Sequence, residues 1–149
     1  MTAQREDGLS AFRRRAEQVL DAFNCGDFEA AWGWLPGDFE FHPIPDWPDA
    51  EVARGPHEVI RYFQDEVREM FPDWRGQIEL ISEVAPDTYL NHLVMRGAGR
   101  AGGVPTETDL FQVWDMDSER PIRVREFLRR EEALAAARGT APDKGAPER

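Results

Sequence analysis

From residue 74 to residue 129 the chain reads WRGQIELISEVAPDTYLNHLVMRGAGRAGGVPTETDLFQVWDMDSERPIRVREFLR. Four runs in this stretch are rich in Val, Ile, Thr, Tyr, Phe and Trp, the residues that strands favour. The runs lie at roughly 74–84, 87–97, 105–116 and 121–129. Turn signals separate them, namely Pro86-Asp87, the glycines of 97–103 and Asp117-Ser118. The stretch therefore predicts a four-stranded antiparallel meander.

The chain upstream of this meander has apolar residues at helical spacing. A first helix is expected from Leu9, because apolar residues then recur three and four positions apart, as one buried helical face requires. Gly26 and Asp27 supply a stop signal and the start signal of a short second helix. Gly55-Pro56 opens a third helix, whose apolar stripe reaches Met70.

These elements together predict an α+β fold. Between the second and third helices, Phe39 to His42 alternate like a strand, and three prolines then impose an extended loop around Trp47. Three N-terminal helices followed by a meander must pack their stripes on one face of the sheet. A strongly bent, mostly antiparallel sheet would wrap these helices and leave a pocket. Ala133 to Ala137 indicate a last helical turn or two.

Length and composition indicate one domain. The chain has 149 residues, of which 41% are hydrophobic, and one domain of this size buries most of its unfolded surface. We expect this domain over residues 9–137, with flexible tails at 1–8 and 139–149 that carry too little apolar surface to fold. A single cysteine, Cys25, excludes an intramolecular disulfide and a cysteine-based zinc site.

The charge and hydropathy of the chain exclude two classes of binding partner. There are 18 Lys and Arg against 29 Asp and Glu, a net charge of −11, which opposes binding to nucleic acid or an anionic membrane. No apolar run approaches the length of a bilayer span, and Met1 to Ser10 is unlike a signal peptide. We therefore expect a cytoplasmic protein whose partner is neither nucleic acid nor a membrane.

The order of these elements, with the motif Phe23-Asn24-Cys25-Gly26-Asp27-Phe28, resembles the SnoaL-like proteins of the nuclear transport factor 2-like superfamily. The resemblance covers about residues 9 to 137 and extends to three further motifs. These motifs are Phe39 to Pro43, Arg54-Gly55 leading into Val59 to Phe63, and Arg123 to Phe127 followed by Glu131 to Leu134. It implies a cone-shaped α+β barrel with an apolar cavity, commonly a homodimer, that needs no cofactor.

The superfamily includes ketosteroid isomerase, polyketide cyclases, limonene epoxide hydrolase and non-catalytic binding domains, so the fold alone does not choose a function. The isomerase's pocket tyrosines would fall at Val19 and Gln64, and the epoxide hydrolase's arginine would fall at Glu107. Neither activity is therefore transferred to this chain, because removing one pre-organised donor from such a site typically costs about 100- to 1,000-fold in rate.

The resemblance places Asp109 in the cavity, where the isomerase keeps a protonated aspartate. On the strand 107–114 one face carries Asp109, Phe111 and Val113, and a carboxyl beside Phe111 in a dry pocket would have a raised pKa. The alternative is an acid on a solvated face or one paired with a buried arginine. Both faces of this strand are partly apolar, which indicates that its outer side is also covered, as it would be in a dimer.

Glu126 is the second candidate acid, because it lies between Val124 and Leu128 on one face of the last strand. The corresponding strand carries an acid in the epoxide hydrolases, and two carboxyls reaching one cavity could act as base and acid. The alternative is an ion pair with an arginine, for which the sequence offers Arg96, Arg123 and Arg125.

His42 is the third candidate, since it stands before Pro43 where the isomerase has its base. Its alternative role is to satisfy loop backbone groups. Three scattered histidines lack metal-ligand spacing, and we predict no metal. Aromatic residues at regular spacing are more often core than ligand box, except Trp47 in its proline-bounded loop. The expected substrate pocket comprises Val19, Trp47, Phe63, Gln64, Phe111, Val113, Val124 and Leu128.

The function expected from the sequence is that of a homodimer, joined through the outer sheet face, that binds a small, largely apolar oxygenated molecule. The leading hypothesis is a cofactor-free isomerase, cyclase or hydrolase, with Glu126 or His42 as base and Asp109 as acid. The rival hypotheses are a non-catalytic binding or dimerisation module and a protein–protein adaptor. An enzyme of this kind requires at least two of the three residues to meet in the cavity.

Overall fold

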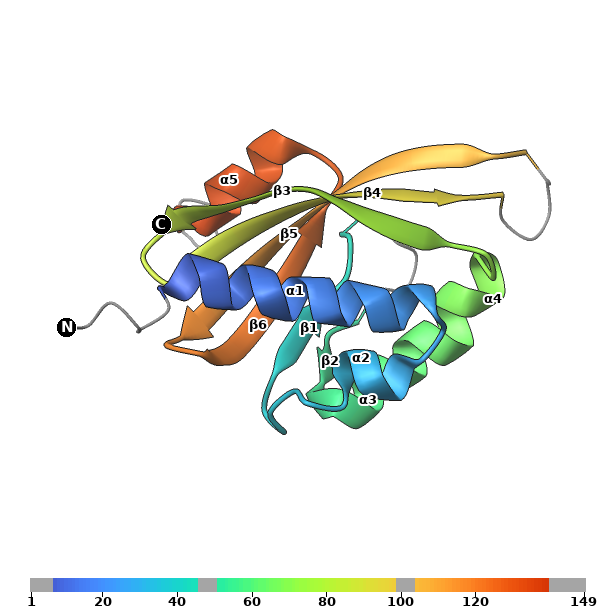
Figure 1. The fold of residues 1–149 in the computed structure, drawn as a ribbon, viewed down its shortest axis with the longest axis horizontal. Coiled ribbons are helices and arrows are strands. Elements are labelled where there is room, and N and C mark those ends of the chain that lie inside the picture. The colour runs from blue at the N-terminus through green and yellow to red at the C-terminus, as the bar shows by residue number, and fades with distance from the viewer. Residues whose placement is uncertain (1–6, 46–50, 99–103, 140–149) are drawn as a thin grey trace.

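The computed structural model describes residues 7–45, 51–98 and 104–139 (Figure 1). The helices are α1 (Gly8–Asn24), α2 (Phe28–Trp32), α3 (Gly55–Tyr62), the π-helical segment η2 (Phe63–Val67), α4 (Arg68–Met70) and α5 (Arg130–Ala137). The strands are β1 (Glu40–His42), β2 (Ala53–Arg54), β3 (Arg75–Ala85), β4 (Thr88–Gly97), β5 (Thr106–Asp117) and β6 (Arg120–Phe127). Trp47 and the ends of both predicted tails lie outside the described residues.

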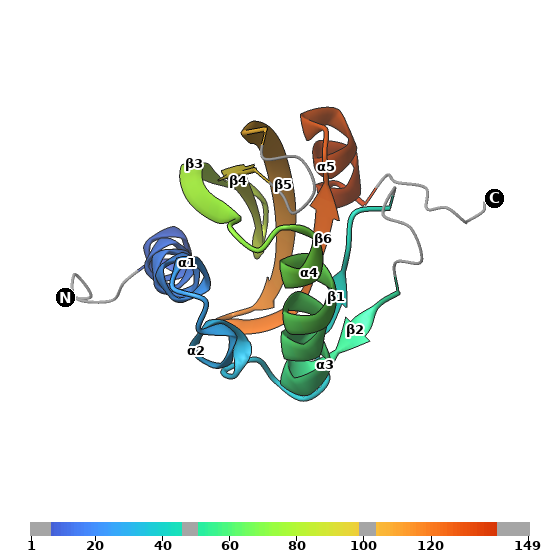
Figure 2. The same ribbon diagram turned by 90° about the vertical axis from the view of Figure 1, so that its right-hand side faces the viewer.

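Within the described residues the strands form one sheet in the order β2-β1-β6-β5-β4-β3. Strand β1 runs parallel to β6, and the other neighbours are antiparallel. The sheet is strongly curved, with α1, α2 and α3 on its concave side and α5 on the other (Figure 2). The predicted α+β class and the bent, mostly antiparallel sheet are confirmed, although this sheet is open and not closed into a barrel.

Capping residues fix the ends of α1 and α2, and the sequence predicts two of them, Gly26 and Asp27. The backbone N–H of Ser10 donates to Asp7 Oδ1 at 2.7 Å, and that of Ala30 donates to Asp27 Oδ1 at 3.1 Å. These carboxylates satisfy N–H groups that have no partner within the helix. Gly26, with φ of 78°, ends α1 in the left-handed conformation that glycine adopts without strain.

The end of α1 is joined to the sheet through Asn24. Its side-chain amide donates to the carbonyl of Gly76 at 3.0 Å and accepts from the Gly76 N–H at 2.8 Å. This pair of bonds extends the edge of β3 and fixes the distance between helix and sheet. A second close backbone contact begins α3, where Gly55 has φ of 76° and an added Cβ would lie 2.8 Å from the carbonyl oxygen of Gly37.

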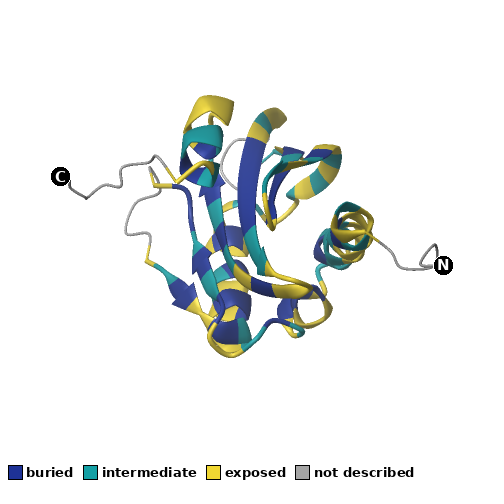
Figure 3. Ribbon diagram, turned by 90° about the vertical axis from the view of Figure 1, so that its left-hand side faces the viewer, coloured by how far each residue is buried: buried dark blue, intermediate teal, exposed yellow. Residues whose placement is uncertain are grey.

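Two apolar cores lie on opposite faces of the sheet. Figure 3 shows how buried and exposed residues alternate along the strands. The larger fills the concave side between the helices and the sheet and includes Leu110 and Trp114 of β5. The smaller lies under α5 on the convex side and includes Phe111 and Val113. Alternate residues of β5 therefore enter different cores, as the pleat requires. The covered outer side that suggested a dimer is thus partly covered by α5 of the same chain.

Among the described residues, no helix is both long enough and apolar enough to cross a bilayer.

Candidate functional site

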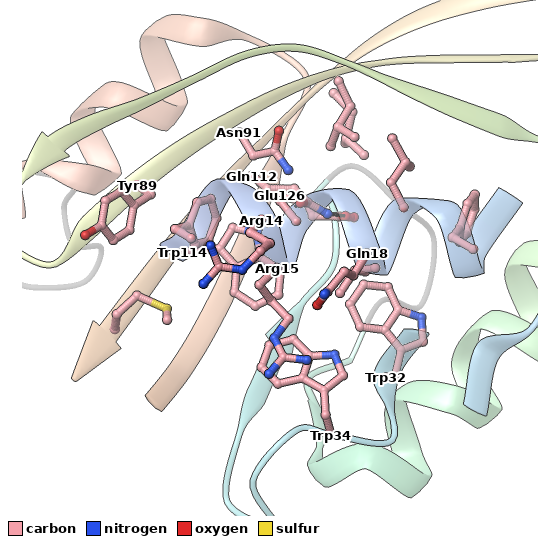
Figure 4. A pocket seen from close by; sticks show the side chains of 18 of the residues that line it. Arg14, Arg15, Gln18, Trp32, Trp34, Tyr89, Asn91, Gln112, Trp114 and Glu126 are labelled. Carbon is pink, nitrogen blue, oxygen red and sulfur yellow. Dashed lines mark hydrogen bonds between the residues drawn. The ribbon is translucent and has the colours of Figure 1, made fainter. Parts of the chain in front are cut away.

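A cavity of about 300 Å³ lies between α1, α2, η2 and the concave face of the sheet (Figure 4). Aromatic and aliphatic side chains make most of its wall, among them Phe12, Val19, Phe23, Trp32, Phe63, Leu93 and Leu110. The helix α1 contributes Arg14, Arg15 and Gln18 to the lining, and all three are exposed. Since these polar side chains remain in solvent while the wall is apolar, they mark the mouth of the cavity.

A row of three polar residues crosses the sheet inside this cavity. Asn91 of β4 pairs directly with Gln112 of β5, and Gln112 pairs with Glu126 of β6. Residues directly opposite on neighbouring strands project from the same face, so the register alone places all three on the concave wall. All three are buried. Figure 4 shows them side by side.

Hydrogen bonds fix the middle and one end of this row. Gln112 Nε2 donates to Glu126 Oε2 at 2.8 Å, and Trp114 Nε1 donates to Gln112 Oε1 at 3.0 Å. An indole N–H can only donate, so it must face the amide oxygen, and the amide NH₂ must then face Glu126. Trp114 therefore orients a donor toward the carboxyl.

The Glu126 carboxyl is 7% exposed, and its burial raises its pKa from 4.5 to about 7. Burial in an apolar wall disfavours the charged form, and the bond from Gln112 opposes this effect without cancelling it. The carboxyl is therefore close to half ionised at neutral pH.

The arginines that the sequence offered to Glu126 bind other acids. Arg123 Nε and Arg125 Nη2 both bind Asp115 Oδ2, at 2.7 and 3.0 Å. Arg96 Nη2 binds Glu107 Oε2 at 3.2 Å. The ion-pair alternative for Glu126 with these three residues is therefore wrong.

Tyr62 also lines the cavity, from the last residue of α3. Burial and then the negative charge of Glu126 raise the pKa of this phenol above its ordinary value of 10. A phenol with a raised pKa keeps its proton at neutral pH and remains a hydrogen-bond donor. The cavity thus combines a titrating carboxyl with a permanently protonated hydroxyl.

Asp109 does not lie in the cavity, so that expectation is wrong. Its side chain is 62% exposed on the other face of β5 and is bonded to His92 Nε2 at 2.9 Å. The prediction chose the wrong face of the strand. Both faces of β5 are apolar, because α5 covers the convex face, so the pattern did not show which face meets α1, α2 and α3.

His42 is also absent from the cavity lining. Its ring Nε2 lies 2.9 Å from Glu40 Oε1, and the side chain is 31% exposed. Phe41, its neighbour in β1, is fully buried in the main core and therefore takes the inward position. The structure consequently brings only Glu126, of the three candidate catalytic residues, into the cavity.

The expected pocket residues divide in the same way. Val19 and Phe63 line the cavity, whereas Val124 is buried in the main core outside the lining. Phe111 and Val113 pack under α5, and Gln64 and Leu128 are exposed. Trp47 lies outside the described residues.

Sequence reasoning missed Asn91, Gln112, Trp114 and Tyr62. A signal for Gln112 existed, since it lies between Leu110 and Trp114 at alternate positions of one strand, and a polar residue on an apolar face is informative. Asn91 could be found only from the strand register. Among the described residues, no group of three or more His, Cys, Asp or Glu is placed to hold a metal ion.

Comparison with known proteins agrees with this architecture. No family model matches the sequence, and no curated protein matches it. Among solved structures, an NTF2-like protein from Burkholderia thailandensis E264 has a TM-score of 0.67 at 18% identity, over 87% of this chain and 96% of that one. The chain has the nuclear transport factor 2-like fold.

Two further structures with this fold are similar at a comparable level. A SnoaL-like protein from Jannaschia sp. CCS1 has a TM-score of 0.66 at 13% identity, over 93% of this chain and 98% of that one. RV0760c from Mycobacterium tuberculosis, in complex with estradiol-17beta-hemisuccinate, has a TM-score of 0.64 at 14% identity, over 81% of this chain and 95% of that one. The resemblance inferred from the sequence is therefore confirmed at the level of the fold.

Proposed function

We propose that this protein binds a small, largely apolar molecule with a few oxygens in the cavity, and that Glu126 transfers a proton to or from it. The observation that carries the proposal is the buried Glu126 carboxyl, which faces a cavity of about 300 Å³ with a pKa of about 7. A base or acid is most effective when its pKa lies near the working pH. The complex of a structural neighbour, RV0760c, with the steroid derivative estradiol-17beta-hemisuccinate supports the binding part.

The hydrogen bond from Gln112 gives the two carboxyl oxygens of Glu126 different roles. Oε2 accepts from Gln112, which leaves Oε1 to exchange a proton with the bound molecule. The Gln112 donor stabilises the carboxylate form and keeps it available as a base. Tyr62 is our candidate for the second group, because its phenol can donate to an oxygen on which negative charge develops.

A non-catalytic binding module is the second candidate function. It is favoured by the positions of Asp109 and His42, since neither of the residues expected to work with Glu126 lines the cavity. The cavity would then bind its ligand without changing it, and Glu126 would serve only as a hydrogen-bonding group. Cytoplasmic location, a homodimer through the outer sheet face, and the lack of a cofactor stay predictions.

The two candidates differ in one assay that needs no knowledge of the natural substrate. The test molecule is 5-nitrobenzisoxazole, a small aromatic compound that a base opens by removing its ring C–H proton. The C–H electrons form a nitrile while the N–O bond breaks to leave a phenolate, and the base keeps the proton. The proposal expects a rate that rises with pH through about 7 and then levels off.

Variants test whether Glu126 is responsible for this rate. Glu126→Gln should lower it by about 100-fold or more, the usual contribution of a positioned base. Asp109→Asn is the matched control, because it makes the same change of charge outside the cavity, and it should keep the rate. A Glu126→Gln protein as fast as the wild type would overturn the catalytic proposal. A wild type that binds the compound without opening it would favour the binding module.

A further inference from the structure

Arg15 stands at the mouth of the cavity, where Trp34 holds its guanidinium. The guanidinium carbon lies over the ring of Trp34, 4.2 Å from the ring centroid, and Figure 4 shows the side chain reaching from α1 to that ring. The indole N–H of Trp34 donates to the carbonyl of Ala31 at 2.7 Å, which fixes the ring beside α2. The attraction between the cation and the ring therefore holds the guanidinium in one place at the mouth.

This guanidinium has no acidic partner among the described residues, although the chain carries 29 Asp and Glu. Arg96 and Arg123, by comparison, each bind an acid of β5. The helix offers Arg15 no partner either, because the residues one turn away on α1 are not acidic. They are Ala11, Phe12, Gln18 and Val19. The N–H donors of Arg15 are thus left to solvent or to a bound molecule.

The acids of the cavity lining do not neutralise this charge. There are two of them, Glu126 in the sheet and Glu119 in the turn between β5 and β6, and neither forms an ion pair with Arg15. Arg14 and Gln18 line the mouth from the same helix and bring no negative charge to it. An anionic group at the mouth could therefore bind Arg15 without displacing an acid of the described residues.

We infer that the ligand is an apolar ring body with a carboxylate, which Arg15 binds at the mouth while the ring lies in the cavity; this rests on the proposed function, because it concerns the same cavity. A guanidinium presents two parallel N–H donors that match the two oxygens of a carboxylate. The wall of Phe12, Leu93 and Leu110 suits the ring, and about 300 Å³ accommodates a bicyclic one. The carboxylate stays at the solvent edge, because burying an ionised group in an apolar wall is costly.

The inference is tested with a matched pair of compounds, 2-naphthoate and 2-naphthamide, which share a ring body and nearly the same shape but differ in charge. Dissociation constants are measured by isothermal titration calorimetry at pH 6 and low ionic strength, where an exposed charge is least screened. At this pH the naphthoate is ionised, whereas Glu126 is mostly protonated and repels it little. The wild type should bind the naphthoate about fivefold or more tightly than the amide, because a hydrogen bond between two charged groups is stronger than one to a neutral amide.

Variants of α1 identify the cation. Arg15→Gln removes the charge and should bring the ratio of the two constants to about one, while an affinity for the amide within about twofold of the wild type shows that the cavity is intact. Arg15→Met, which keeps an apolar stem over Trp34, repeats the test should glutamine disturb the mouth. Arg13→Gln is the matched control, because Arg13 is exposed on the same helix and does not line the cavity, and it should keep the fivefold ratio.

Three results would overturn the inference: a wild-type ratio near one, a ratio that survives loss of the Arg15 charge, or a ratio lost equally in Arg13→Gln, which would assign it to the general charge of the helix. Failure of both compounds to bind would do the same and would also count against the binding part of the proposed function. Failure of the inference alone is distinguishable, since the amide would still bind and opening of 5-nitrobenzisoxazole would still depend on Glu126. Conversely, a naphthoate preference that depends on Arg15 in a protein that opens nothing would support the binding module and the inference together.

Discussion

Replacing Glu126 by glutamine should change how stability depends on pH. In the folded chain burial raises the pKa of this carboxyl to about 7, whereas in the unfolded chain it returns to its ordinary value of 4.5. Between these values the folded chain holds a proton that the unfolded chain has released. The stability contributed by this proton is therefore fully present below pH 4.5 and is lost as the pH rises through 7.

The magnitude follows from the two pKa values. The gap between 4.5 and about 7 corresponds to roughly 3 kcal/mol in all, most of which falls between pH 5 and pH 8. Glutamine has nearly the same shape, can still accept from Gln112 through its amide oxygen, and does not titrate. Relative to Glu126→Gln, the wild type should thus lose roughly 2–3 kcal/mol of unfolding free energy over this range.

Urea unfolding of both proteins at pH 5, 6, 7 and 8 measures this difference. Subtracting the two curves removes the contributions of the histidines and of other groups that titrate alike in both proteins. Glu79→Gln, which makes the same change at an exposed acid of β3, should not show this trend. A wild type and Glu126→Gln whose difference stays constant from pH 5 to pH 8 would refute the reasoning, because it would mean that the carboxyl is solvated.

Three further predictions concern single substitutions. Trp114→Phe should raise the pKa of Glu126 further, because Gln112 loses the partner that orients its donor; carboxyl NMR titration of the variant measures this, and an unchanged midpoint would count against the hydrogen-bond chain. Asp109→Asn should leave the rate of 5-nitrobenzisoxazole opening within about twofold, because the side chain lies outside the cavity, and a larger loss would restore Asp109 to the site. Gly55→Ala should lower stability by roughly 1–3 kcal/mol in urea unfolding, since φ is 76° and the new methyl group would meet a backbone carbonyl, and a neutral result would show that this turn relaxes.

The fold was predictable because local signals and the overall layers agree. Leu9 begins a helical stripe, Gly26 ends it, and the glycine and proline signals separate the strands close to where the structure has them. The short strand β2 was not foreseen, since two residues carry no readable alternation. The sequence predicts continuous helix where the structure has the π-helical segment η2. The spacing of apolar residues does not show that one turn contains an extra residue.

The candidate site was only partly predictable, because alternation along a strand does not say which face is inside. Glu126 could be predicted because burying an unpaired carboxylate between two apolar neighbours costs free energy, so such a group usually has a role. On β5 the same argument failed, because α5 supplies the convex face with its own core and makes Phe111 and Val113 as apolar as Leu110 and Trp114. The residues of β5 that face the cavity can be identified only from the strand register, which pairs Gln112 with Glu126.

The ionisation of Glu126 tests the central claim most directly. It can be followed by ¹³C NMR of protein labelled at the glutamate carboxyl carbons, titrated from pH 4 to pH 9 with Glu126→Gln as the assignment control. The structure predicts one signal with a midpoint near 7 that is missing from the variant. If every glutamate signal titrated at an ordinary value of about 4 to 5, Glu126 would be a solvated acid and the proposed proton transfer would be contradicted.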